Sequence, residues 1–384
     1  MKLKSLMLGS AAAVMVAGGA QAADLTIAES VDYVRVCDAF GVGYWYIPGT
    51  DTCIKIGGSV QMDLKFQKDG WLTGAVDGHW TITGESTVVT RVFFVPFGWT
   101  TVLQGTYVDT IPGHQSHWKF VTEAVVNFTA KSMTEYGALV GYVALKGVAD
   151  PNGDDDMRLD EAYLSLGHVL FGYTGSVQNT SGGFAPGAYV PDTKTNQVRL
   201  SWAAAGFGLA LGIEDPRKRW GTELDDADVE DYSMPDIVGA LTVAQGHWDA
   251  KVTAGWGDLS LGSVYGVAGT LTAGAAPFQV RVGGAFGTGT AFVGDGLSSK
   301  FMFVDGTSMW TAFVSGIWQA APTLSVAGTF SYSAQGSVNG TRGGAKLVWA
   351  PVPGFEAYAE GKAWKFTGDT QHTWEAKVGA KRFW

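Results

Sequence analysis

The sequence has 384 residues and combines few charges with many glycine and aromatic residues: 16% Asp, Glu, Lys and Arg, 54 Gly, and 12% Phe, Trp and Tyr. A typical soluble domain has about 25% charged residues and about 7% Gly. A disordered chain has few aromatic residues, and a nucleic-acid binder usually carries a basic face, whereas this chain has a net charge of −10. These values exclude both classes, and no uninterrupted apolar run predicts a transmembrane helix.

The first 22 residues have the features of a secretory signal peptide. Lys2 and Lys4 precede an apolar stretch from Leu6 to Val16, and Ala20 to Ala22 form a small-residue cleavage pattern. We therefore expect an exported chain whose mature form begins at Ala23.

The only two cysteines, Cys37 and Cys53, follow in the exported part. In an oxidising compartment a disulfide is the natural interpretation, and closing a loop of this size stabilises by roughly 3 kcal/mol. A metal or nucleophile site would need His or acidic partners, and only Asp38 and Asp51 are near. We expect residues 23–53 to form an N-terminal segment on the periplasmic side, closed by this bond.

From residue 54 onward, apolar residues recur with a period of two. In residues 54–66, for example, Met62 and Leu64 share one face while Asp63 and Lys65 share the other. The alternating runs are about nine to thirteen residues long, as a tilted strand needs to cross a bilayer, whereas strands of soluble sheets usually have about 5 to 6 residues. The pattern predicts membrane strands with one lipid-facing side and one wet side.

The connections and strand ends favour an outer-membrane barrel. Very short turns, such as residues 245–247 and 320–322, alternate with long polar loops, such as residues 215–236 and 287–308. Tryptophans near strand ends fit interfacial girdles. The strands are expected at residues 54–66, 120–131, 135–146, 157–166, 169–176, 196–204, 207–214, 237–245, 248–256, 262–272, 278–287, 309–319, 323–333, 342–350, 355–366 and 372–384.

The predicted fold class is therefore all-β, a transmembrane antiparallel β-barrel of 16 strands over residues 54–384. Residues 67–118 do not fit a single loop: they are either an extracellular hairpin insertion or two extra wall strands, which leaves eighteen strands as the alternative. Side chains do not fill the lumen of a barrel of either size, so a water-filled channel follows.

Several blocks of the chain resemble the alphaproteobacterial (Rhizobiales-type) porins. They include VDYVRVCDAFGVGYWYIPGTDTCIKIGG, LDEAYLSLGHVLFGYTGS and the C-terminal RFW, and the resemblance covers most of the mature chain except residues 67–118. It implies a trimeric sixteen-stranded porin of the bacterial outer membrane. It also implies that a long loop, here residues 175–195, folds into the lumen as a constriction.

The resemblance further implies acidic groups on this loop opposite basic groups on the wall. This chain departs from that pattern, because its loop carries only Asp192 and Lys194. We therefore expect a weak field across the pore. The candidate pore-lining charges are Asp192, Lys194, Lys55, Asp63, Lys65, Lys131, Arg199, Lys251, Arg281, Glu360, Lys362 and Lys377.

Two loops could hold ions or lipid. The oxygen-bearing residues Asp150, Asn152, Asp154, Asp156 and Glu161 follow a calcium-loop spacing, but position 6 is not Gly and the flanks are strands. They are a weak metal candidate beside the simpler interpretation of an acidic surface loop. In the second loop, Arg217, Lys218 and Arg219 could contact lipopolysaccharide phosphates.

The sequence thus predicts a porin for passive diffusion of ions and small hydrophilic solutes, a homotrimer in contact with outer-membrane lipid and lipopolysaccharide. Two alternatives stay open: a solute-specific channel, for example for sugars, and a surface adhesin or receptor barrel with little conduction. Motifs of serine hydrolases, nucleotide-binding loops and zinc proteases are absent from the sequence. We expect neither catalysis nor a cofactor nor a nucleic-acid partner.

Overall fold

The structure is a computed structural model, and it describes residues 35–73, 79–86, 102–108, 114–151, 156–220, 234–259, 262–288, 290–294, 308–369 and 371–384. The expected signal peptide, residues 1–22, lies outside the described residues. The described part divides into two units, an N-terminal unit up to Ile54 and a second unit from Lys55 to Trp384.

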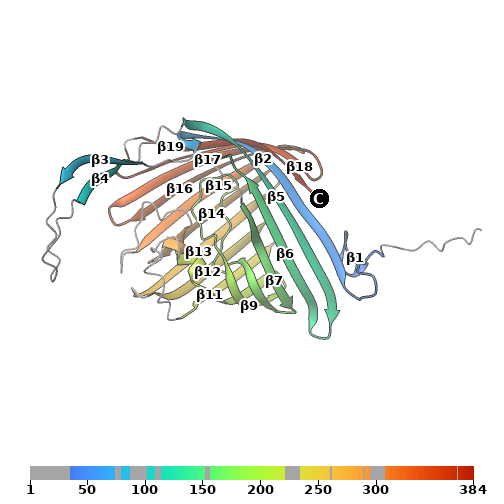
Figure 1. Cartoon of the computed structure of the whole chain (residues 1–384). Helices are drawn as coiled ribbons and strands as arrows, with labels where there is room; N and C mark the ends of the chain where they lie inside the picture. The colour runs from blue at the N-terminus through green and yellow to red at the C-terminus, as the bar shows by residue number, and fades with distance from the viewer. Residues whose placement is uncertain are drawn as a thin grey trace, which may run out of the picture. The chain divides into compact units, whose positions relative to one another are not determined.

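The second unit is built almost entirely of long strands (Figure 1). The strands that form the barrel wall are β2 (Cys53–Thr73), β5 (His114–Thr134), β6 (Gly137–Ala149), β7 (Asp156–Leu166), β8 (Val169–Gly175), β9 (Lys194–Ala204), β10 (Phe207–Glu214), β11 (Asp236–Gln245), β12 (Trp248–Leu259), β13 (Gly262–Ala275), β14 (Phe278–Gly287), β15 (Met309–Ala321), β16 (Leu324–Gln335), β17 (Val338–Val352), β18 (Phe355–Phe366) and β19 (Thr373–Phe383).

These sixteen strands form a closed antiparallel ring, which confirms the predicted barrel. Each strand pairs with the next along the chain, β19 pairs with β2, and β2 in turn pairs with β5. The ring is sealed at the chain end, where the backbones of Gly58 and Trp384 exchange two hydrogen bonds of 3.2 Å. Closure leaves the described wall strands without an unpaired edge.

The segment 67–118 is partly wall strand and partly a separate pair of strands. Its first residues continue β2 to Thr73 and its last residues begin β5 at His114. Between them β3 (His79–Ser86) and β4 (Val102–Val108) form their own two-stranded sheet, so the eighteen-strand alternative is wrong. The period-two pattern stops near residue 67 because a strand that runs beyond the hydrocarbon no longer needs an apolar face.

The two faces of the wall have opposite chemistry. On β16, Phe330 is 53% exposed, while its neighbours Thr329 and Ser331 are 6% and 1% exposed. On β15, Val314 is 49% exposed and Ser315 is 1% exposed. Large apolar side chains therefore point out of the barrel toward lipid, and small hydroxyl side chains point into it.

The N-terminal unit contains the 3-10 turn η1 (Asp38–Phe40) and the short strand β1 (Trp45–Tyr46), which pairs with Cys53 and Ile54 at the start of β2. Cys37 and Cys53 form the expected disulfide. In the part of the chain that the structure describes, no helix has the length and apolar character of a membrane span.

Candidate functional site: the inner segment and the pore wall

The chain between β8 and β9, residues 176–193, is called here the inner segment. Its backbone N–H at Phe184 donates to Ser315 Oγ on β15 (2.8 Å), and its carbonyl at Gly187 accepts from Ser331 Oγ on β16 (2.5 Å). Neither strand neighbours β8 or β9 in the ring. Because Ser315 and Ser331 belong to the buried face, the inner segment crosses the inside of the barrel.

Basic side chains of the wall hold the first half of the inner segment. Lys251 Nζ on β12 donates to the carbonyl oxygen of Asn179 (2.5 Å), and Arg281 Nη1 on β14 donates to that of Gly182 (2.7 Å). Arg199 on β9 donates to the last carbonyl of β8. Three of the predicted lumen cations are therefore bound to backbone oxygens.

The second half of the inner segment is fixed by packing. Tyr189 is 2% exposed and belongs to a cluster with Val293 and Met309. The guanidinium of Arg342 on β17 lies 3.8 Å from the centre of the Tyr189 ring, a cation–π contact. Burial raises the pKa of the Tyr189 phenol and outweighs the opposite effect of the neighbouring Arg342.

A buried ion triad anchors the start of the inner segment. Arg219, in the short helix α2 (Arg217–Trp220), pairs with Glu214 and with Asp236 (2.9 Å), and all three side chains are inaccessible to solvent. Glu214 also accepts from Ser176 Oγ (2.6 Å) and from the N–H of Val177 (2.8 Å). Arg219 is thus not available to lipid phosphates, contrary to the expectation for this loop.

The two charges expected on the constriction loop are both engaged. Lys194, the first residue of β9, pairs with Asp160 (2.9 Å) and Glu161 (3.1 Å) on β7. Asp192 accepts from the amide of Asn179 (3.4 Å) inside the inner segment itself. The inner segment therefore presents no acidic cluster among its described residues.

Most of the remaining predicted lumen charges meet on neighbouring strands β17, β18, β19 and β2. Lys377 pairs with Glu360 (3.2 Å) and Asp63 (3.7 Å), Lys346 pairs with Glu360 (3.4 Å), and Lys362 pairs with Glu375 (2.9 Å). With Lys65, which lies directly opposite Lys377 in the strand register, they form a group of four lysines and three carboxylates. We call it the wall charge cluster: Asp63, Lys65, Lys346, Glu360, Lys362, Glu375 and Lys377.

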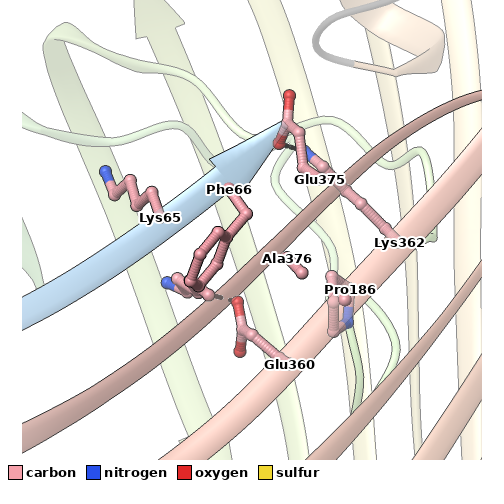
Figure 2. A pocket seen from close by; sticks show the side chains of 9 residues that line it. Lys65, Phe66, Pro186, Glu360, Lys362, Glu375 and Ala376 are labelled. Carbon is pink, nitrogen blue, oxygen red and sulfur yellow. Dashed lines mark ion pairs between the residues drawn. The ribbon is translucent and has the colours of Figure 1, made fainter. Parts of the chain in front are cut away.

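The wall charge cluster faces the inner segment across a cavity of about 180 Å³. Five charged members, Lys65, Glu360, Lys362, Glu375 and Lys377, line it together with Pro186 of the inner segment. Figure 2 shows Lys65 extending from β2, and Glu360 and Lys362 from β18, around this space.

The inner segment approaches the wall closely where Pro186 meets Gly344 of β17. A Cβ atom placed on Gly344 would overlap the carbonyl oxygen of Pro186 and lie 2.7 Å from its carbonyl carbon. Only glycine accepts this approach of two backbones.

Two other predicted lumen residues lie outside this group. Lys55 belongs to β2 near the N-terminal end of the strand, and Lys131 belongs to β5, opposite Val140 of β6. Neither lines the cavity beside Pro186.

The predicted calcium-loop ligands are not brought together where the structure describes them. Asp150 pairs with a lysine of β5 (2.7 Å), and Asp156 pairs with an arginine of its own strand (2.6 Å). Glu161 accepts from Thr174 Oγ1 (2.8 Å) besides its lysine. Positions 152 and 154 lie outside the described residues, and the described ones contain no group of three metal-binding side chains.

Sequence reasoning missed the partners of these charges rather than the charges themselves. Lys346 and Glu375 lie on the same inward rows as the predicted Glu360 and Lys362, since Lys346 is opposite Glu360 and Glu375 is opposite Lys362. The period-two pattern could have found both. Nothing in the sequence marks Gly344 or Pro186 as contacting residues, because their sequence separation is large.

Comparison with known proteins decides the family. The model of the Porin subfamily matches residues 24–382. The chain belongs to this porin family. Porin Omp2a of Brucella ovis is 31% identical over 283 residues, which are 68% of this chain and 69% of that porin. The predicted resemblance to the alphaproteobacterial porins is confirmed, and the chain is an outer-membrane porin.

Solved structures share the fold at low identity. The outer membrane channel DcaP of Acinetobacter baumannii has a TM-score of 0.64 at 14% identity, covering 88% of this chain and 99% of that one. OmpT of Vibrio cholerae in its trimer form has a TM-score of 0.52 at 11% identity, covering 87% of this chain and all of that one. Both similarities concern the barrel alone.

Proposed function

We propose that this porin forms a water-filled channel for passive diffusion of ions and small hydrophilic solutes, and that the inner segment is its constriction. The closed ring has a polar inner face, and the inner segment covers the hydroxyl-rich wall of β15 and β16. The wall charge cluster lies beside this covered wall, on β17, β18, β19 and β2, and lines a cavity with Pro186. The attachment of the inner segment to β15 and β16, on one side of the lumen, is the observation that supports the proposal.

The channel works without catalysis in this proposal. A solute enters the lumen, passes between Pro186 and the wall charge cluster, and leaves at the other end, driven by its own gradient. The lysine–glutamate pairs of the cluster, which are partly exposed, exchange partners with water and passing ions at low energetic cost, because pairs near solvent contribute only about 0 to 1 kcal/mol. The field across the constriction is weak, since the described residues of the inner segment carry no acidic cluster opposite the basic groups of the wall.

We further propose a homotrimer. The porin family and the trimer form of the structurally similar OmpT support this assembly. Outer-membrane lipid and lipopolysaccharide are then the partners of the exposed apolar faces that remain outside the subunit contacts.

Planar-bilayer recording of the purified protein tests the proposal. A general porin gives large ohmic steps in groups of three that sugars do not block. Block by one class of sugar favours a solute-specific channel instead. Absence of conductance from a protein that shows β-structure and heat-dependent gel mobility favours an adhesin or receptor barrel and contradicts the proposal.

A further inference from the structure

The wall charge cluster contains one cation that its neighbours do not neutralise. Asp63 and Glu360 both contact Lys377, and Asp63 also accepts from the hydroxyl of Tyr358. Glu360 is shared with a second lysine of the cluster. The side chain of Lys65 has neither an ion pair nor a hydrogen bond with any described residue.

The position of Lys65 is unfavourable for the fold alone. It lies directly opposite Lys377 in the pairing of β2 with β19. Side chains in this relation have Cβ atoms about 4.5 to 5.5 Å apart, and like charges there destabilise a sheet. A neutral residue at position 65 would preserve the strand and remove the repulsion between Lys65 and Lys377. The stability of the fold therefore does not explain why residue 65 is a lysine.

The surroundings of Lys65 suit an anion. Lys65, Lys362 and Lys377 come from three adjacent strands and line one cavity of about 180 Å³. Glu360 and Glu375 line the same cavity, but each already contacts a lysine (Figure 2). The cavity therefore has an excess of one positive charge, and Pro186 lines it on the side of the inner segment.

We propose that Lys65, with Lys362 and Lys377, forms a binding step for small oxyanions, carboxylate or phosphate, beside the constriction. An oxyanion in the cavity relieves the repulsion between Lys65 and Lys377 and accepts hydrogen bonds from both ammonium groups. Solutes that carry such a group are thereby concentrated at the narrowest part of the path. This inference rests on the proposed channel function and adds a solute class to it.

Bilayer recordings on four forms of the protein test the binding step: wild type, K65Q, K65R and K381Q. Lys381 is the matched control, because it lies on β19 four residues beyond Lys377 and does not line the cavity. Reversal potentials are measured in a KCl gradient, and block is measured with inorganic phosphate and, separately, with citrate. Heat-dependent gel mobility establishes folding, and K65T replaces K65Q if that variant does not fold.

We expect K65Q to shift the reversal potential toward cation preference and to weaken block about fivefold, the effect of removing a unit charge about 4 Å from an anion in water. K65R and K381Q should retain block. Weakening with both blockers, or with one alone, supports the site and identifies the preferred oxyanion. Unchanged block in K65Q, or an equal loss in K381Q, overturns the inference and leaves the porin intact. A wild type without conductance overturns the proposed function as well.

Discussion

Replacing Gly344 by alanine tests whether the inner segment sets the size of the pore. The new Cβ atom would lie 2.7 Å from the carbonyl carbon of Pro186 and would overlap its oxygen, whereas ordinary contacts begin near 3.4 Å. Pro186 must therefore retreat from β17 by at least about 0.7 Å, and a retreat from the wall moves it into the lumen. We expect a lower single-channel conductance in G344A.

The same displacement weakens the attachment of the inner segment. Thr329 Oγ1 donates to the carbonyl of Ala185 (2.8 Å) and accepts from its N–H (3.2 Å), and Ser331 donates to Gly187 (2.5 Å). Three such bonds contribute about 0.5 to 1.5 kcal/mol each, so their loss would free the segment to fluctuate and add open-channel noise.

Gly343→Ala is the matched control for this test. It adds the same methyl group one residue earlier on β17, where the nearest atom would be 3.8 Å away. Single-channel recording of both variants, after gel mobility has shown that they fold, measures the effect. Equal conductance in G344A and G343A would refute the assignment of the inner segment as the constriction.

Three further predictions concern other parts of the molecule. In R219A the two carboxylates of the buried triad lose the cation that bridges them, and breaking such a pair costs about 3 to 5 kcal/mol. Thermal unfolding of the detergent-solubilised barrel should therefore begin at a lower temperature; an unchanged transition would contradict the triad as an anchor. K251M removes the bond between Lys251 and the carbonyl of Asn179 in the inner segment, but it leaves the wall charge cluster unchanged. We therefore expect more open-channel noise with an unchanged reversal potential. A shifted reversal potential without added noise would assign Lys251 to selectivity instead. Replacing Cys37 and Cys53 by serine should leave conductance and the heat-dependent mobility of the barrel unchanged, since the disulfide closes a loop of the N-terminal unit; loss of the folded band on the gel would show that the barrel depends on it.

The barrel could be predicted from the sequence because its information is local. In β16 the alternation of Phe330 with Thr329 and Ser331 indicates which face of the strand points toward lipid. Short and long connections recur on alternate ends and fix the antiparallel order. The extensions of β2 and β5 could not be predicted, because strands beyond the bilayer do not need an apolar face and so do not show the period-two alternation.

The candidate site was only half predictable, for a physical reason. A charged residue on a polar row, such as Arg281, is recognisable from the alternation alone. Whether it contacts water, a carboxylate or a carbonyl oxygen depends on where residues 176–193 run, and that path is set by contacts between segments about 100 residues apart, such as Arg281 with Gly182. Alternation carries no information about such contacts.

The distribution of cations over the wall gives the pore its asymmetry. Lys251 and Arg281 are bonded to backbone carbonyls, which are dipoles without net charge, so their positive charge is retained but covered by the inner segment. Lys65 stands on the opposite part of the ring, and no described residue of the inner segment bonds to its side chain. A passing ion therefore meets the excess charge of the cluster before that of the covered cations. On this reasoning selectivity depends on β18, β19 and β2, while the basic residues of β12 and β14 determine how firmly the constriction is held.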